Sequence, residues 1–456
     1  MFILIVNQWE IMNLLKKLPC CCAAFISLFF VAKSYAYEPH NPKDHKYEES
    51  IYQNSKVINS KVITLQEAIN LGLEFSPEVK SSKDGIAAAQ GLEKQAGYWS
   101  NPNFEIEAAN IAGTGPYTGS DSAEYTYSLS KSIDISGKRY ARKNAATQAK
   151  NAANSNFMAA KLSIMRNIHV AYASVLAEAE ALKLAKEQEL LAKQILKTVS
   201  KSVNAARESE IQKIKATVAY ESAVIATSQE KQQFNSAKQN LAKLLGKNSL
   251  DVSLDHSHFF DLTAPDHITT YQTKLNDSPI LKKFYYLSKE KKFAYDLEIA
   301  SKVSDPTVKI GIREFRGSDE EALVVGLSIP LPIFNRNQGN TSHARAKLSQ
   351  ARNNELHAKL SLEQSLIEEW RNWQISYQTA DKLKNKILPT AKKAFRVAKS
   401  GYEKGKFPYF EVLDAQRILF DARAKYHTAL KQYHVARANI ELITTPINNL
   451  KGKKDE

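Results

Sequence analysis

The sequence repeats itself at an offset of 199 residues, and this duplication constrains the fold more than any other feature. Alanines spaced seven apart have counterparts at that offset, namely Ala145 with Ala344, Ala152 with Ala351 and Ala159 with Ala358. The offset drifts slightly upstream, where Ser76-Pro77 aligns with Ser278-Pro279. Self-similarity of this kind predicts two copies of one structural unit, at 64–246 and 278–445, separated by a spacer at 247–277 that we expect to be a loop.

Each predicted unit has the same order of elements. A helix over 76–99, or over 278–302 in the second copy, ends before an Asn-Pro or Asp-Pro dipeptide. A β-hairpin follows, at 103–135 and at 306–333, because apolar and polar residues alternate there. A long helical hairpin completes each unit, at 137–246 and at 337–443; its helices are expected over 137–202 and 208–245 in the first copy and over 337–400 and 408–443 in the second.

The alternating segments have the length and pattern of membrane strands. Tyr125, Tyr127 and Leu129 in the first copy, like Leu323 and Val325 in the second, are separated by mostly polar residues. A single hairpin of this kind would suit a soluble sheet, but two in matching repeat positions favour the membrane. Four strands leave edges that lipid does not tolerate, so we expect copies of the chain to assemble, with about 8 strands as a dimer or 12 as a trimer.

The N-terminus predicts export. Lys16 and Lys17 precede an apolar run over 18–31 and a small-residue site ending at Ala36, which together are typical of a cleaved signal peptide at 1–36. All three cysteines, Cys20 to Cys22, lie in this leader. An N-terminal extension follows at 37–63, and a basic tail occupies 446–456. The net charge of +15 is spread along helices with Glu interleaved, so we expect no nucleic-acid partner.

With this layout, several stretches of the sequence resemble the TolC-like outer membrane efflux factor family, and specifically its heavy-metal cation-efflux branch (cobalt–zinc–cadmium and copper–silver). The resemblance covers about residues 64–445 and rests on the order and spacing of short motifs. These are Thr64-Leu65-Gln66-Glu67-Ala68, Ser76-Pro77-Glu78-Val79, Ser100-Asn101-Pro102-Asn103, Ser136-Gly137-Lys138-Arg139, Ile329-Pro330-Leu331-Pro332-Ile333-Phe334-Asn335-Arg336 and the run from Gly405 to Gln416.

The resemblance implies a mostly α fold with a small β part. In such a fold, long coiled-coil helical hairpins form a periplasmic α-helical tunnel, and four strands per chain contribute to a trimeric 12-stranded barrel in outer-membrane lipid. It also implies three partnerships: a homotrimer, a periplasmic adaptor (membrane fusion) protein, and an inner-membrane proton-driven efflux pump. The function implied is the exit duct of a tripartite efflux pump for heavy-metal cations.

The resemblance also assigns residues. Glu411 and Asp414 match acidic positions that ring the periplasmic entrance in the family, and their i, i+3 spacing puts them on one helix face. The adaptor-facing tips would include Ala205, Ala206, Arg207, Gly401, Tyr402, Gly405 and Lys406. The first tip has Ala205-Ala206 where the second has Lys404-Gly405, so it lacks the glycine expected at a helix end.

Two alternatives stay open in the sequence. One is an outer-membrane factor for drug or organic-compound efflux or for type I secretion, and the other is a periplasmic coiled-coil adaptor or scaffold without a channel. His256 and His258 could ligate a metal, but no cysteine is nearby and we expect no specific site there. His427 and His434 fit a helix surface or seam. No catalytic motif is present, so we expect neither catalysis nor a bound cofactor or resident metal.

Overall fold

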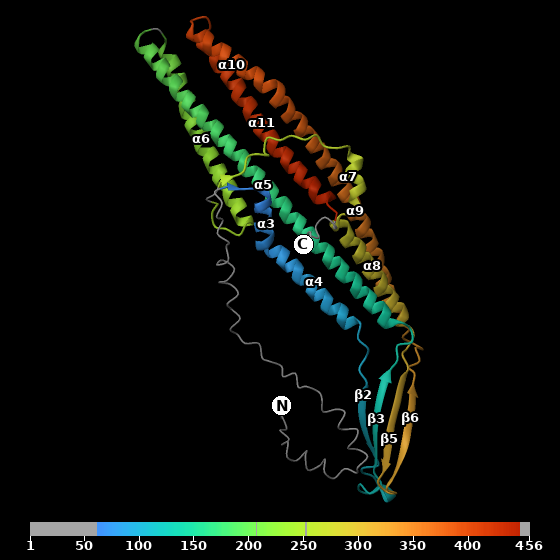
Figure 1. Ribbon diagram of the computed structural model, residues 1–456. Coiled ribbons are helices and arrows are strands. Elements are labelled where there is room, and N and C mark those ends of the chain that lie inside the picture. Colours follow the sequence, from blue (N-terminus) through green and yellow to red (C-terminus); the bar gives the residue numbers. More distant parts are fainter. Residues whose placement is uncertain (1–61, 207, 251–252, 447–456) are drawn as a thin grey trace, which may run out of the picture. The chain divides into compact units, whose positions relative to one another are not determined.

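Two copies of one element order run through the computed structural model, which describes residues 62–206, 208–250 and 253–446. The first copy contains α4 (Pro77–Ala96), β2 (Asn103–Ala109), β3 (Glu124–Ser132), α5 (Lys138–Asn204) and α6 (Glu210–Leu244). The second contains α8 (Pro279–Ala300), β5 (Thr307–Phe315), β6 (Glu320–Ser328), α9 (Gln338–Lys382), α10 (Leu388–Glu403) and α11 (Tyr409–Thr444). Figure 1 shows the helices side by side in one elongated bundle, with the strands at one end and two helical turns at the other.

The described residues fall within a single compact unit, Val57–Glu456. The expected signal peptide at 1–36, most of the expected extension at 37–63 and nearly all of the expected basic tail lie outside the described residues. None of the described helices combines the length and the apolar character that a membrane span requires.

The four long strands form one antiparallel sheet in the order β2-β3-β5-β6. The register aligns Phe104, Leu129, Ile310 and Val325 in one row across the sheet. The central pairing, β3 with β5, joins the two copies of the repeat, so the hairpins form a continuous wall rather than two separate sheets. Strands β2 and β6 are the edges.

Two of the strands are shorter than the alternation predicted. The pattern continued to Ile135 and Ile333, whereas β3 ends at Ser132 and β6 ends at Ser328. Beyond β6, Pro330 and Pro332 have no N–H group to donate to a ladder. Beyond β3, a single further bond, from Ile133 N to Pro306 O at 2.9 Å, closes the pairing. The predicted strand ends were therefore wrong by three to five residues.

The helix expected over 337–400 is not continuous. α9 ends at Lys382, a π-helical turn occupies Leu383–Ile387, and α10 resumes at Leu388. Pro389 explains the interruption, because proline lacks the N–H group of a helical hydrogen bond and its ring clashes with the carbonyl four residues earlier. A π-turn widens the helix just before this residue. α5 contains no proline and runs unbroken for 67 residues.

The region expected to be a loop spacer contains two elements that pack onto the bundle. β4 (Ser253–Leu254) pairs in parallel with β1 (Val62–Ile63), and α7 (Ile268–Leu275) follows. The hydroxyl of Tyr172 in α5 contacts the carbonyl oxygens of Ile63 at 2.8 Å and Asp255 at 3.0 Å. The first and middle segments of the chain are thus attached to the same helix.

The helix α3 (Leu65–Phe75) begins with a capping box. Thr64 Oγ1 accepts from Glu67 N at 3.3 Å, and Glu67 Oε2 accepts from Thr64 N at 2.8 Å. These reciprocal bonds satisfy two of the N–H groups that a helix start leaves unpaired. α3 then packs into the main apolar cluster of the bundle, whose most buried members include Ile168, Leu241 and Leu430.

Candidate functional site

The first candidate surface is the apolar face of the four-stranded sheet. Alternate residues of all four strands lie on this face. In the single chain, the apolar side chains that β2, β5 and β6 place there are more than 40% exposed. They include Phe104 and Ile106 of β2, Val308, Ile310 and Ile312 of β5, and Leu323, Val325 and Leu327 of β6. A contiguous apolar face of this kind is uncommon on proteins that meet only water. It needs a cover of lipid or protein.

The opposite face of the sheet is polar and internally paired. Lys309 Nζ contacts Glu105 Oε2 at 3.0 Å, and Arg313 contacts Glu124 at 3.2 Å. Arg313 Nε also donates to Thr126 Oγ1 at 2.9 Å, and Thr126 is buried below these longer side chains. One face therefore suits lipid, and the other suits a water-filled interior.

The second candidate surface consists of the two tips at the far end of the bundle, where short turns connect α5 to α6 and α10 to α11. In the first turn, Ala205 N donates to Lys201 O and Ala206 N to Val203 O. In the second, Lys404 N donates to Ser400 O and Gly405 N to Tyr402 O, which are the same bonds shifted by the repeat offset. Arg207 lies outside the described residues.

The first tip contains an alanine in a left-handed backbone conformation, which the sequence did not predict. Ala206 has a φ of 53° and Gly405 a φ of 68°, so both occupy the left-handed position that closes a helix. Glycine adopts this conformation freely, whereas a residue with a Cβ atom is strained there. The first tip keeps the geometry of the second without its glycine.

We therefore expect Ala206→Gly to stabilise the first tip by about 0.5–1 kcal/mol, because it relieves this strain. Hydrogen exchange of amides in the last turn of α5 would slow by up to about fivefold. Ala205→Gly is the matched control: Ala205 has a φ of −89°, so glycine brings no relief there. Equal effects of the two substitutions would contradict the strain at Ala206.

The second tip is closed by aromatic contacts. A Cβ atom on Gly401 would meet the ring of Phe407 at 2.0 Å, so glycine allows that ring to cross the helix closely. The rings of Tyr402 and Tyr409 lie 5.4 Å apart, and burial raises the pKa of Tyr409. Lys406 N donates to Gly401 O at 2.8 Å and is exposed at the end of the turn.

The acidic pair Glu411 and Asp414 lies in the first two turns of α11. Glu411 is exposed, and Asp414 Oδ1 contacts Arg417 Nη2 at 2.7 Å. Arg417 is not among the residues that the resemblance assigns, although its i, i+3 position relative to Asp414 predicts such a pair. The charge of Asp414 is thus partly offset within the same chain.

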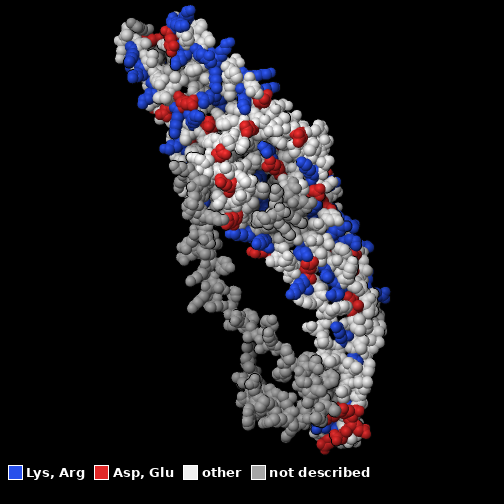
Figure 2. All heavy atoms as spheres, in the orientation of Figure 1, with Lys and Arg blue, Asp and Glu red and all other residues white. Residues whose placement is uncertain are grey.

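The charge of the described chain is unevenly distributed along its length. Figure 2 shows Lys and Arg gathered at the helical-tip end and Asp and Glu at the far end of the sheet. This acidic end includes Asp121 and Asp319 of the strand connections and Glu320 and Glu321 at the start of β6. Two ion pairs join α11 to α5 between these ends: Lys431 contacts Glu178 at 2.8 Å, and Arg423 contacts Glu187.

The histidines noted in the sequence lie in different surroundings. His258 is exposed and contacts Asp261 at 3.0 Å, and within residues 62–206, 208–250 and 253–446 no group of three His, Cys, Asp or Glu side chains is placed to hold a metal ion. His427 and His434 are buried on the inner seam of α11 rather than exposed. His434 Nε2 contacts Phe259 O at 3.0 Å, and burial lowers its pKa to about 4.

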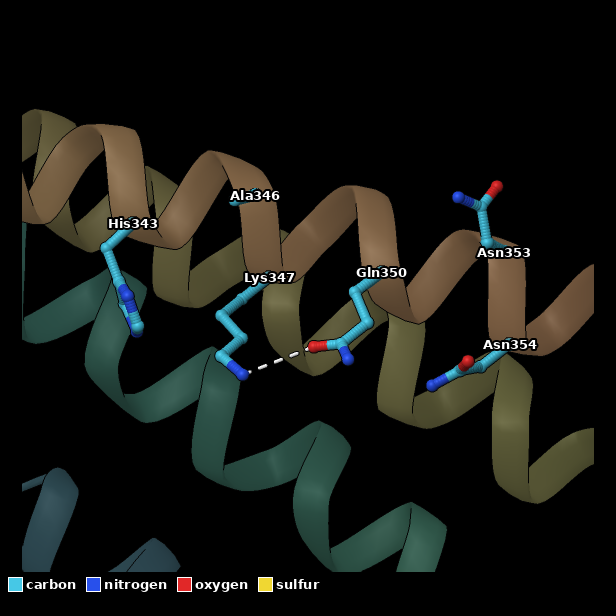
Figure 3. Close-up of a pocket in the computed structure, with 6 residues that line it drawn as sticks. All are labelled: His343, Ala346, Lys347, Gln350, Asn353 and Asn354. Carbon is cyan, nitrogen blue, oxygen red and sulfur yellow. Dashed lines mark hydrogen bonds between the residues drawn. The ribbon is translucent and has the colours of Figure 1, made fainter.

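A shallow hollow of about 470 Å³, lined mostly by polar residues, lies along α9. Figure 3 shows His343, Lys347, Gln350 and Asn354 following one another along the helix, with Lys347 Nζ 3.2 Å from Gln350 Oε1. All of its lining residues come from this single helix. A row of neutral and basic side chains along one helix suits a surface in contact with water. It does not contain a nucleophile with an adjacent base, so it does not resemble a catalytic site.

Comparison with known proteins identifies the family. The family described as "Outer membrane efflux protein" matches residues 68–247 and 313–444, which are most of both repeats. The chain belongs to this family. Membership confirms the resemblance inferred from the sequence, together with the localisation in the outer membrane with a long periplasmic portion.

The relatives of this outer membrane efflux protein include two metal-resistance proteins. The cobalt-zinc-cadmium resistance protein CzcC of Cupriavidus metallidurans is 28% identical over 381 residues, covering 84% of this chain and 90% of the relative. The nickel-cobalt-cadmium resistance protein NccC of Alcaligenes xylosoxydans is 25% identical over 286 residues, covering 61% of this chain and 64% of the relative.

A solved structure supports the fold independently. The outer membrane protein VceC of Vibrio cholerae superposes with a TM-score of 0.70 at 18% identity, covering 84% of this chain and 96% of the other. The mostly helical architecture with a small sheet is therefore the one that such outer-membrane proteins share. At this level of identity the comparison concerns the fold alone.

Proposed function

We propose that three copies of this chain form the exit duct of a tripartite efflux pump that exports heavy-metal cations. The observation that carries the proposal is the sheet: four strands with an exposed apolar face, an ion-paired polar face and two edge strands. Open edges are not stable in lipid. Pairing β6 of one copy with β2 of the next three times would give a closed wall of 12 strands.

The helices give the duct its length. The 67 residues of α5 span about 100 Å at about 1.5 Å per residue, far more than a bilayer is thick. Since the sheet lies at one end of the bundle (Figure 1), three such bundles would continue the barrel as a tunnel into the periplasm. The polar row along α9 would then suit a water-filled wall.

Metal cations are the proposed cargo because the matched relatives are named for cobalt, zinc, cadmium and nickel resistance. Efflux of drugs or other organic compounds, or type I secretion, is the alternative within the same fold. Growth of a deletion strain on a panel of metal salts, dyes and detergents separates them. Sensitivity confined to dyes and detergents would contradict metal export.

The partners follow from this role. A periplasmic adaptor would meet the two tips through Ala205, Ala206, Arg207, Gly401, Tyr402, Gly405 and Lys406, and an inner-membrane proton-driven pump would supply the energy, so that this chain itself catalyses nothing. The test of the duct is cell fractionation followed by electrophoresis with and without heating. A heat-dissociable trimer in the outer membrane that forms channels in lipid supports it, and a freely soluble monomeric periplasmic scaffold overturns it.

Glu411 and Asp414 are proposed to ring the periplasmic entrance. A three-fold axis would bring up to six carboxylates together at the mouth, which would attract cations and resist anions. Replacing both residues by alanine is expected to lower the cation-to-anion permeability ratio severalfold in planar bilayers. Arg417→Ala should raise it, because Asp414 then loses its partner at 2.7 Å.

Glu403→Ala is the control for this experiment, since Glu403 is an exposed carboxylate of the same tip that ends α10 instead of starting α11. An unchanged permeability ratio in the double variant would remove the acidic entrance from the proposal. It would leave the trimeric duct itself intact.

A further inference from the structure

A cluster of basic and aromatic side chains lies where the apolar face of the sheet meets the helices. Lys131 continues the row of Tyr127 and Leu129 on β3, so it belongs to the apolar face although it is charged. It is exposed, and its Nζ lies 5.9 Å from the centre of the Trp99 ring. A single cation at the end of a lipid-facing row is placed where a membrane ends and water begins.

Arg139 and Arg142, from the start of α5, complete the cluster. The guanidinium of Arg139 lies 4.5 Å from the centre of the Trp99 ring, and its Nε donates to Gly97 O at 2.6 Å. Arg142 donates to the carbonyl oxygens of Ala96 at 3.1 Å and Tyr98 at 3.1 Å. These bonds to the end of α4 fix both arginines in position.

The nearby carboxylates are already engaged. Asp134 accepts hydrogen bonds from the backbone N–H groups of Ser136, Lys138 and Arg139, and Asp305 is paired with Lys138 at 2.8 Å. No carboxylate forms an ion pair with Lys131, Arg139 or Arg142 in the part of the chain that the structure describes. Arg139 and Arg142 line one groove of about 650 Å³ together with Lys138, Asp134 and Asp305, and Lys131 lies beside it at the ring of Trp99, which also lines the groove. Four cations against these two engaged carboxylates leave the region net positive.

We propose that this groove binds the phosphate group of an anionic glycerophospholipid in the leaflet on the helical side of the membrane. Arginine forks and a lysine suit a phosphate, and the exposed rings of Trp99, Tyr98 and Tyr140 suit the boundary between acyl chains and water. A lipid held here would fix the depth of the barrel in the membrane. The inference rests on the proposed function, because it needs the sheet to be embedded in lipid.

The experiment uses the full protein reconstituted into phosphatidylcholine vesicles that contain a small fraction of brominated lipid. Bromine on the acyl chain quenches tryptophan fluorescence at short range, and Trp99→Phe identifies the signal that comes from Trp99. We expect brominated phosphatidylglycerol to quench Trp99 more strongly than brominated phosphatidylcholine at the same fraction. Lys131→Gln should reduce this preference by about fivefold, since each basic side chain at an anionic surface contributes that much.

Two further variants make the result specific. Lys131→Arg should retain the preference, because it keeps a phosphate-binding cation at the site. Lys309→Gln also removes one lysine charge and serves as the control. Lys309 follows Val308, the partner of Lys131 in the sheet, and lies on the opposite, polar face, where it pairs with Glu105. This variant should leave the preference unchanged. Both variants leave the arginines that hold the end of α4 untouched, so folding is preserved.

The outcomes are distinguishable. Equal quenching by the two lipids in the unmodified protein, or an unchanged preference in Lys131→Gln, overturns the proposal. Equal quenching by the two lipids together with binding of inorganic phosphate that Lys131→Gln weakens shows a site for free phosphate and overturns the lipid as its ligand. Conductance of the same vesicles reports on the duct separately: conducting vesicles without a lipid preference refute this inference alone, and absence of both trimer and conductance refutes the proposed function.

Discussion

Leu323→Arg is expected to prevent assembly of the channel in the membrane. Leu323 is 70% exposed on the apolar face of the edge strand β6 and aligns with Ile312 of β5. An arginine on the lipid face of a barrel costs about 2–4 kcal/mol at the bilayer midplane, and a trimer carries the substitution three times. The amount of heat-dissociable trimer in the outer membrane should fall by at least about thirtyfold.

Val324→Arg is the matched control for this substitution. Val324 is the next residue of the same strand, aligns with Gly311 and lies on the polar face, where an arginine would meet water. Trimer yield should stay close to that of the unmodified protein, and the permeability of the channel to anions should rise. Equal loss in both variants would indicate a general effect on β6, and equal tolerance of both would mean that lipid does not contact this face.

The repeat and its order of elements could be predicted because they depend on local patterns. The alternation that includes Tyr127 and Leu323 indicated strands, and the absence of proline over most of the first unit indicated an unbroken α5. The break after Lys382 was missed, although Pro389 signals it. How a helix accommodates an internal proline depends on what packs around it, and a π-turn is only one of the possible outcomes.

The site was predictable only in part, for a similar reason. The resemblance indicated Glu411 and Asp414 as entrance residues, and that role stays a prediction. The structure adds the partner Arg417, which a spacing rule could have found. The left-handed φ of Ala206 could not be expected, because alanine rarely adopts it. The cluster at Trp99 combines a loop, a strand end and a helix start, so only the folded chain brings these residues together.

Buried His434 makes the stability of the helical bundle depend on pH. Its ring stacks on Phe259 at 5.3 Å, and Nε2 must carry the proton that it donates to Phe259 O. Burial is the main cause that lowers the pKa of His434 to about 4; the Phe259 carbonyl opposes the shift, and His169 and Arg437 add to it. The neutral ring is therefore the form that the fold accommodates.

The direction of the effect follows from linkage. In the unfolded chain the pKa of a histidine is about 6.5, so between about pH 6.5 and pH 4 the unfolded state binds a proton that the native state does not. Stability contributed by the neutral ring is complete above about pH 7 and is lost as the pH falls through this window. The expected loss is about 2 kcal/mol per chain between pH 7 and pH 5.

His434→Gln isolates this contribution, because glutamine retains an N–H donor for the Phe259 carbonyl and does not titrate. Urea unfolding of the detergent-solubilised protein at several pH values should show a shallower decline in the variant than in the unmodified chain. His258→Gln, at a histidine side chain that is 89% exposed, should leave the slope unchanged. If the free energy of unfolding depends on pH in the same way in His434→Gln and in the unmodified protein, burial of the neutral His434 ring does not cause the pH dependence. The ring would then take up a proton in the native bundle without an energetic penalty, and the packing against Phe259 would not exclude water from it.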